Sequence, residues 1–402
     1  MASPKLRFKE FDGEWSSIAI GNFLKIKSGL GFKAEEYTTE EEIRLLQIEN
    51  VGYGAVKWTH NVKFVPSNYL DVHKDLVLKE DDLVLALNRP VTNDQLKIAK
   101  LTKEDSPSIL YQRVGKLDFL KEDVDRDFVF QIFQKDVKSY VLNSSIGSDQ
   151  PFISTTDLYK HILCIPLKEE QTKIASFLSA VDEKIAQLTQ KHELLSQYKQ
   201  GMMRKLFSQQ IRFKADDGSE FGEWDQKELK EVAHINPKAK KLPENFIYID
   251  LESVEKGQLL LEKNITLSEA PSRAQRLLAK GDVLFQMVRP YQQNNYYFNL
   301  DGQYVASTGY AQIRTELNSK FIYYAVHEKA FLDEVMNRCT GTSYPAINSS
   351  DLSTIEIGIP CLEEQIKISN FLSAIDQKIE KVTQQIEETK QWKKGLLQQM
   401  FV

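Results

Sequence analysis

The sequence predicts an α+β protein in which two domains of mixed α/β structure are separated by two long helices that pair as an antiparallel coiled coil, giving a pseudo-two-fold internal repeat. Three observations predict this fold. A C-terminal segment repeats an earlier one, each repeat ends in a long heptad pattern, and short β-like runs fill the regions between.

The repeat is the strongest of these features. Residues 147–208 align without a gap on residues 341–402, and about 26 of the 62 positions are identical. The matching segments are GSDQPFISTTDL with GTSYPAINSSDL, and IPLKEEQTKIASFLSAVDEKI with IPCLEEQIKISNFLSAIDQKI. A leading motif that ends in Trp precedes each variable region, as FDGEW at 11–15 and FGEW at 221–224. A duplicated frame therefore surrounds two regions that have diverged.

Each repeat ends in a predicted helix, from about Glu169 to Phe207 and from about Glu363 to Phe401. Apolar residues recur there at alternating steps of four and three, which is typical of a coiled-coil seam. The predicted seam consists of Ile174, Leu178, Val181, Ile185, Leu188 and Leu195 in the first helix, and of Ile368, Leu372, Ile375, Ile379, Val382 and Ile386 in the second. Lys199 and Lys393 also fall on the seam and are expected to mark where the helices separate. The nearest available partner for each helix is the other one.

Helices of about 39 residues would each extend roughly 58 Å at 1.5 Å per residue. A stiff antiparallel pair of this length would hold two domains at a set separation. Duplex DNA suits two domains held apart in this way, because sites one helical turn apart lie about 34 Å from each other and each could be read by one domain.

The sequence divides into four parts. These are a first α+β domain at 1–165, a central helix at 166–208, a second α+β domain at 209–360 with a linker at 209–220, and a C-terminal helix at 361–402. The β-like runs are 44–48, 83–87 and 128–133 in the first domain, and 246–251, 282–288 and 304–314 in the second. A further helix is expected at 320–336.

Polar and aromatic residues gather in loops that follow two corresponding Arg-Pro pairs, and Asn, Gln and Arg can contact base edges bidentately. The candidate DNA contacts are Asn88, Arg89, Asn93 and Gln95 in the first domain, Arg289, Gln292, Gln293 and Asn294 in the second, Ser148, Gln150, Thr342, Ser343 and Tyr344 in the repeated loop before each helix, and Lys240 and Arg273 as phosphate ligands. For each residue the alternative is an ordinary solvated loop, and the repeated Pro would then only shape a turn.

Composition alone does not favour nucleic acid, because the formal charge is −5 and the isoelectric point is about 5.9. A local basic surface could still exist within an acidic chain. Three scattered cysteines suit a reducing compartment, and the N-terminus lacks the apolar core of a signal peptide. The protein is expected in the cytoplasm, associated with the nucleoid through DNA.

Motifs for catalysis are missing from the sequence. It has no Walker loop and no HxxxH or CxxC metal pair, and Asn236-Pro237-Lys238 lacks the second proline and the aromatic residue of an amino-methyltransferase motif. Glu228-Leu229-Lys230 has the E-x-K spacing of a nuclease, but a match of that length carries no weight alone. The chain is therefore predicted to be non-catalytic, without a metal or cofactor of its own.

In its leading FxGEW motif, its G-S/T-x-x-P loops and its duplicated IPxxEEQxKIxxFLSA-[VI]-D helices, the chain resembles the specificity subunits of Type I restriction–modification systems over nearly its whole length. The resemblance implies two target recognition domains, each reading one part of a split asymmetric DNA sequence. It also implies two modification subunits that carry S-adenosylmethionine and methylate adenine, and restriction subunits that use ATP and Mg for translocation and cleavage.

Two other functions remain open from the residues alone. A coiled-coil scaffold whose end domains bind proteins would fit the acidic isoelectric point. A fused nuclease or methyltransferase with a degenerate motif would be the third alternative.

Overall fold

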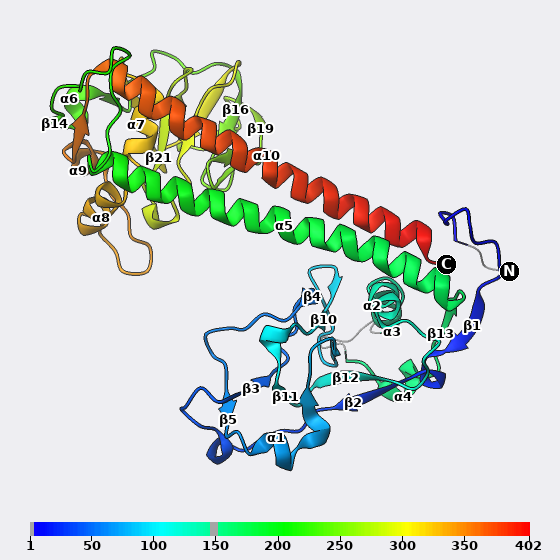
Figure 1. Cartoon of the computed structure of the whole chain (residues 1–402). Helices are drawn as coiled ribbons and strands as arrows, with labels where there is room; N and C mark the ends of the chain where they lie inside the picture. Colours follow the sequence, from blue (N-terminus) through cyan, green and yellow to red (C-terminus); the bar gives the residue numbers. More distant parts are fainter. Residues whose placement is uncertain (1–3, 145–151) are drawn as a thin grey trace. The chain divides into compact units, whose positions relative to one another are not determined.

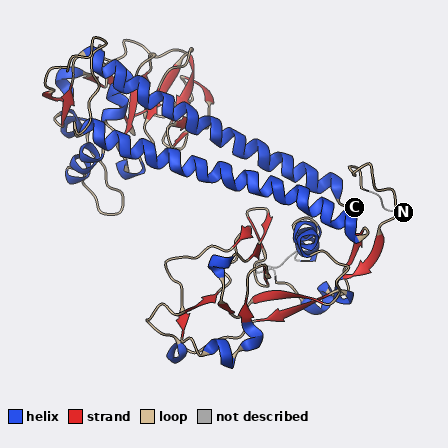
Figure 2. Cartoon of the chain, viewed as in Figure 1, coloured by secondary structure: helices blue, strands red, loops and turns tan. Residues whose placement is uncertain are grey.

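The computed structural model describes residues 4–144 and 152–402. The chain forms two compact units: unit 1 comprises Met1–Leu188 and Gln385–Val402, and unit 2 comprises Thr189–Gln384. Each unit includes about half of α5 (Lys168–Phe207) and about half of α10 (Leu362–Met400), so each long helix contributes residues to both units (Figure 1). In each unit the short strands build the globular part (Figure 2).

Unit 1 contains two main sheets. The five-stranded sheet has the order β2 (Leu24–Ser28), β12 (Val114–Phe119), β7 (Leu83–Ala86), β10 (Ile98–Lys100) and β4 (Gly54–Ala55). The four-stranded sheet has the order β5 (Phe64–Val65), β3 (Ile43–Leu46), β11 (Ser108–Leu110) and β6 (Val77–Leu78). Two strand pairs complete it, β1 (Ser16–Ala19) with β13 (Ile162–Ile165) and β8 (Val91–Thr92) with β9 (Gln95–Leu96). Its short helices are α1 (Tyr69–Val72), α2 (Arg126–Phe133), α3 (Asp136–Ser144) and α4 (Thr155–Leu158).

Unit 2 repeats this plan. One sheet has the order β15 (His234–Ile235), β24 (Tyr310–Arg314), β21 (Val283–Gln286) and β22 (Tyr296–Tyr297), and the other has β19 (Lys263–Thr266), β16 (Asn245–Ile249), β23 (Tyr304–Ser307) and β20 (Ala274–Leu277). The smaller pairs are β14 (Asp225–Glu228) with β25 (Glu356–Ile359) and β17 (Val254–Glu255) with β18 (Gln258–Leu259). The helices are α6 (Leu229–Val232), α7 (Ser319–Ala325), α8 (Lys329–Asn337) and α9 (Ser349–Ser353), with a 3-10 turn η5 at Pro290–Gln292.

The two units share one strand topology. The order β2-β12-β7-β10 corresponds to β15-β24-β21-β22, and β5-β3-β11-β6 corresponds to β19-β16-β23-β20. The parallel pair of β3 with β11 corresponds to the parallel pair of β16 with β23, whereas β4, which pairs with β10 in parallel, is an additional strand of unit 1. The duplication therefore extends through the regions whose sequences differ, and the predicted α+β fold with an internal repeat is confirmed.

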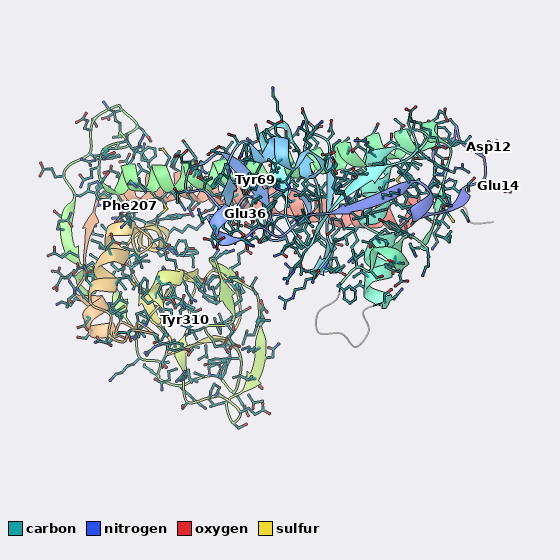
Figure 3. All side chains as sticks on the ribbon, turned by 90° about the horizontal axis from the view of Figure 1, so that it is seen from below. Asp12, Glu14, Glu36, Tyr69, Phe207 and Tyr310 are labelled. Carbon is teal, nitrogen blue, oxygen red and sulfur yellow. The ribbon has the colours of Figure 1, made fainter. Side chains whose placement is uncertain are left out.

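Side chains from strands, short helices and both long helices fill the core of each unit. In unit 1 the buried Leu85, Phe128, Leu178 and Met400 belong to one cluster. In unit 2 the Tyr310 side chain is fully buried, and Figure 3 labels it among the strands of that unit. A smaller polar contact lies at the edge of unit 1, where the Tyr69 hydroxyl donates to Glu36 at 2.9 Å (Figure 3). The globular part of each unit is thus packed directly onto the helices.

The long helices begin and end within one residue of their predicted bounds and run antiparallel within each unit. Seam residues Ile174, Leu178, Val181, Leu188, Ile368, Leu372, Ile375, Val382 and Ile386 are buried, whereas Ile185, Leu195 and Ile379 are partly buried. The expectation that Lys199 and Lys393 mark a separation of the helices is wrong. The Lys199 Nζ lies 2.5 Å from Asp376 Oδ1 on the facing helix, and the Lys393 Nζ lies 2.7 Å from Asp182 Oδ1.

Three secondary-structure predictions inside the variable regions are wrong. Residues 128–133, expected as a strand, belong to α2, because Asp125 caps the helix by accepting from the Phe128 N–H and five apolar side chains are buried around the helix. The helix expected at 320–336 is two helices, since α7 ends at Ala325 and Glu328, in an extended conformation, caps the start of α8. The run 304–314 is two strands, β23 and β24, separated by a turn at 308–309.

Candidate nucleic-acid interface

The repeated EEQ sequence binds an arginine that precedes the leading motif of each unit. Arg7 donates from Nε and Nη2 to the two oxygens of Glu170, both at 2.7 Å, and Arg212 contacts Glu364 in the same way at 3.1 and 2.7 Å. Such bidentate pairs fix orientation as well as distance. The hydrogen bonds to Glu364 raise the pKa of Arg212. The duplicated glutamate is therefore a structural anchor.

The glutamine that follows holds the first short helix of the globular part. Gln171 donates to the Pro166 carbonyl at 2.9 Å and accepts from the Asp125 N–H at 2.9 Å, at the start of α2. Gln365 donates to the Pro360 carbonyl at 2.8 Å and accepts from the Asn318 N–H at 3.2 Å, at the start of α7. Each buried amide thus donates to the turn before its long helix and accepts from the start of a short helix, which explains why this motif recurs.

Each Asp–Lys pair between the long helices also joins the globular part. Gln131 of α2 donates to the Asp182 carboxylate at 2.8 Å, and the Tyr324 hydroxyl of α7 donates to Asp376 at 2.7 Å. Burial of Tyr324 raises its pKa, so it is a neutral donor at ordinary pH. In both units one aspartate therefore connects α5, α10 and the globular part.

The loop between β21 and β22 carries predicted residues Gln292, Gln293 and Asn294, and a network of amides organises it. Gln286 donates to the Gln292 side chain at 3.0 Å and accepts from the Asn294 N–H at 3.0 Å. Asn294 Oδ1 accepts from the Lys256 N–H at 3.0 Å, and Gln293 donates to the His327 carbonyl at 3.5 Å. These bonds hold the loop together, with Gln292 exposed and with Gln293 and Asn294 partly buried.

Beside this loop lies a partly buried histidine that the sequence analysis missed. His327 Nδ1 lies 2.7 Å from the Tyr323 carbonyl, and Nε2 lies 3.4 Å from Asn295 Nδ2. The carbonyl can only accept, so Nδ1 carries the hydrogen and Nε2 is the acceptor. Burial lowers the pKa of His327 to about 4. A single histidine after a helix gives no sequence signal that its ring accepts from an asparagine of a distant loop.

In unit 1 the corresponding loop is a tight hairpin. Asn93 and Asp94 both have positive φ, 51° and 56°, as expected for the two central residues of a type I′ turn. Asn93 donates to the Tyr53 hydroxyl at 3.3 Å. Asp94 forms ion pairs with Lys138 at 2.7 Å and with Lys394 at 3.4 Å, and the bond to Lys138 lowers the pKa of Asp94. The hairpin tip is therefore tied to α3 and α10.

The other predicted contact residues are mostly exposed. Arg89, Gln95, Lys240, Arg273, Thr342, Ser343 and Tyr344 are exposed, and Asn88 and Arg289 are partly buried. Ser148 and Gln150 lie outside the described residues. Two of these candidates come together, because the Arg289 guanidinium lies 4.2 Å from the centre of the Tyr344 ring. Their roles in DNA contact stay predictions.

Two surface grooves lie away from these loops. One in unit 2 is lined by Phe207, Trp224, Glu328, Glu334 and Glu356 among others, and one in unit 1 by residues 119–127 with Lys168. Carboxylates in the unit 2 groove make it a poor surface for phosphates. Across residues 4–144 and 152–402, no three His, Cys, Asp or Glu side chains are placed to hold a metal ion. Among the helices so described, none is long and apolar enough to cross a bilayer.

Comparison with known proteins identifies the family. The family model described as "Type I restriction modification DNA specificity domain" matches residues 12–197 and 222–391. The chain belongs to this family. Both matched ranges contain one recognition fold and part of a long helix, so the Type I specificity domain occurs twice in this chain.

Individual relatives agree with this assignment. The MjaVIII specificity subunit of Methanocaldococcus jannaschii is 36% identical over 211 residues, which cover 52% of this chain and 49% of the relative. The EcoAI specificity subunit of Escherichia coli is 30% identical over 175 residues, covering 42% and 28%. The chain thus spans about half or less of these curated relatives.

Solved structures show the same fold at lower sequence identity. The S subunit of a Type I restriction–modification system from M. genitalium has a TM-score of 0.61 and 16% identity, and the match covers 100% of this chain and 99% of that one. A chain from a study of assembly and conformational transition of the Type I system has a TM-score of 0.56, 18% identity and 98% coverage of both. The specificity-subunit fold is therefore present over the full chain.

Proposed function

We propose that this chain is the sequence-specific DNA recognition subunit of a Type I restriction–modification complex. Each unit reads one part of a split asymmetric target. The observation that carries the proposal is the recurrence of one recognition fold in two regions of different sequence, both matched by the specificity-domain family. Two copies of one fold with unlike surfaces suit a target with two unlike halves.

The long helices set the spacing between the two half-sites and dock two methyltransferase subunits. The way in which the helices pair supports this, because the Asp–Lys contacts and the EEQ anchors recur in both halves. Two halves that are held together in the same way would present two equivalent helix surfaces to two copies of one partner. Restriction subunits complete the complex.

The chemistry belongs to the partner subunits in this proposal. The chain acts without a catalytic site or cofactor of its own, while S-adenosylmethionine is held by the modification subunits, and ATP and Mg by the restriction subunits. The absence of a nucleotide-binding or methyltransferase motif from the sequence supports this division.

The test is methylome sequencing of a host that lacks adenine methylation of its own and that expresses this chain together with Type I modification subunits. We expect adenine methylation at a single split motif. Replacing residues 16–146 by those of a relative should change one half of that motif and leave the other unchanged. A scaffold protein would give no sequence-selective methylation and no sequence-selective gel shift, and either result would overturn the proposal.

A further inference from the structure

The same three segments converge beside the central strand of each unit. In unit 1 the Leu87 N–H donates to the Arg113 carbonyl at 2.9 Å, and the Leu87 carbonyl accepts from Ile153 at 2.8 Å. In unit 2 the Met287 N–H donates to the Gly309 carbonyl at 3.0 Å, and the Met287 carbonyl accepts from Ile347 at 3.0 Å. We call this the converging edge, formed by residues 87–89, 111–113 and 152–153 in unit 1 and by 287–289, 308–309 and 344–347 in unit 2.

Arginines stand on this edge in a backbone conformation that side chains rarely adopt. Arg89 and Arg289 follow β7 and β21, with φ of 45° and 53°, and Arg113 has φ of 66°. Left-handed conformations of non-glycine residues cost free energy and cluster at sites of ligand contact. Asn88 and Val288 are bridged to Phe152 and Ala346, and the Arg289 N–H donates to the Pro345 carbonyl at 2.7 Å. These bonds hold the strained residues in place.

The guanidinium groups on the edge are also uncompensated by charge. Among the residues that the structure describes, no carboxylate lies within 4.0 Å of Arg89, Arg113 or Arg289, although the chain carries a net charge of −5. Arg89 and Arg113 are exposed. By contrast, Arg7 and Arg212 are neutralised by buried glutamates. Free arginines on an acidic protein are conspicuous sites for a ligand that offers acceptors.

Exposed aromatic rings accompany the arginines. Tyr344 is 63% exposed and lies under the Arg289 guanidinium, and Phe152 is 66% exposed beside Asn88. Stacking on Tyr344 orients the planar guanidinium and leaves its N–H groups available. A planar donor pair of this kind matches the O6 and N7 acceptors of guanine in the major groove.

We infer that the converging edge is the base-reading surface of each unit, with Arg89 and Arg113 reading guanines in one half-site and Arg289, oriented by Tyr344, reading a guanine in the other. The inference rests on the proposed function and assigns its specificity-determining residues. Gln292, Gln293 and Asn294 are positioning residues in this inference, because their side chains bond to Gln286, His327 and Lys256 and so fix the loop. Arg113 and Phe152 were absent from the sequence-based candidates, since neither lies near an Arg-Pro pair.

The experiment compares methylomes and duplex binding of the full complex with modification subunits, for the variants Arg89→Ala, Arg113→Ala, Arg289→Ala and Arg289→Gln. Loss of one bidentate contact costs about 1–3 kcal/mol, which is a drop of about 5- to 150-fold in preference for the correct base pair. We expect this relaxation at a G·C pair of one half-site for Arg289 variants and of the other half-site for Arg89 or Arg113 variants. The half read by the unaltered unit reports that the variant has folded and assembled.

Asn294→Asp is the matched variant. It keeps Oδ1, which accepts from the Lys256 N–H, but loses the donor that adenine readout requires. We expect its target to be unchanged, whereas an altered A·T position would overturn the assignment of Asn294. Lys240→Ala is the comparison for a candidate phosphate ligand, and it should weaken binding to all sequences alike and leave the target unchanged.

Two outcomes would overturn the inference while the proposed function stands. One is an unchanged target in all four arginine variants. The other is a uniform loss of affinity for every sequence with a shallower salt dependence, since that is the behaviour of a phosphate contact. If the wild-type complex shows no sequence-selective target, the proposed function itself fails.

Discussion

At the scale of single residues, each long helix begins with a carboxylate that is almost completely removed from water. Glu170 is 2% and Glu364 is 0% exposed, and each is compensated by one arginine from a segment more than a hundred residues away. Breaking a buried pair by removing one partner is costly, because the remaining charge stays without compensation.

Glu364→Gln should therefore destabilise unit 2 by about 3 kcal/mol. It removes the charge that Arg212 faces, and it weakens the bond from Trp224 Nε1, which donates to Glu364 at 3.1 Å. The measurement is the midpoint of urea unfolding followed by tryptophan fluorescence. Glu363→Gln is the control, since that side chain is 54% exposed and should change stability by no more than about 0.5 kcal/mol. Equal midpoints for the two variants would show that the anchor contributes nothing.

His327 should make the stability of unit 2 depend on pH. Its pKa is lowered to about 4, chiefly because burial disfavours the charged ring, whereas the unfolded value is about 6.5. The unfolded chain then binds more protons between these values, so stability is fully present above about pH 6.5 and is lost as the pH falls toward 4. Linkage gives a loss of about 2 kcal/mol between pH 7.5 and pH 5.

The measurement is the urea midpoint at both pH values for the wild-type chain and for His327→Gln. All other titrating groups are common to the two proteins, so the difference between their pH dependences isolates His327. If the variant loses as much stability as the wild type between pH 7.5 and pH 5, His327 is not the source of the pH dependence.

At the scale of elements, the long helices owe their stability to the seam and not to their outer faces. Leu178 is completely buried in the core of unit 1, whereas Leu194 on the same helix is 58% exposed. Leu178→Ala should cost about 3 kcal/mol through lost burial and a residual cavity, and Leu194→Ala about 0.5 kcal/mol or less. Thermal unfolding of the two variants measures the difference, and a comparable loss in both would contradict the assignment of the seam.

Sequence alone predicted these helices to within a residue because a 3-4 repeat over so many turns has one interpretation. It failed at α2, where Phe128 to Phe133 pack on all sides and so lose the periodicity that distinguishes a helix from a buried strand. The shared strand topology of the two units was also out of reach, since strand order depends on contacts between distant segments. Only the blocks around Arg89 and Arg289 retained a visible correspondence.

The correspondence of the two candidate loops was predicted from the sequence, but not the contacts of their side chains, and their role in DNA contact stays a prediction. The loops after both Arg-Pro pairs do lie at corresponding positions. Which amides face solvent could not be read from composition, because Gln286, a strand residue, determines the bonding of Gln292 and Asn294. Arg113 joins the edge only through the pairing of β12 with β7.

At the scale of the whole molecule, an acidic chain is proposed to bind a polyanion. The net charge of −5 is an average, and many of the carboxylates are used in ion pairs or helix starts. In the proposed complex, binding then depends on a few exposed arginines and on the partner subunits, so the isolated chain should bind duplex DNA weakly.

The proposed spacing role of the helices predicts the effect of lengthening them. Inserting four residues after Thr189 of α5, together with four after Ile386 of α10, keeps the antiparallel partners matched and adds about 6 Å of helix. Because base pairs are stacked at about 3.4 Å, the spacer of the methylated motif should grow by one or two base pairs, with both half-sites unchanged. Methylome sequencing of the complex measures this directly.

The same four residues inserted at the exposed turn around Gly218 lengthen no helix and should leave the spacer as it was. A spacer that is identical in all three proteins would mean that the helices do not determine the distance between the half-sites.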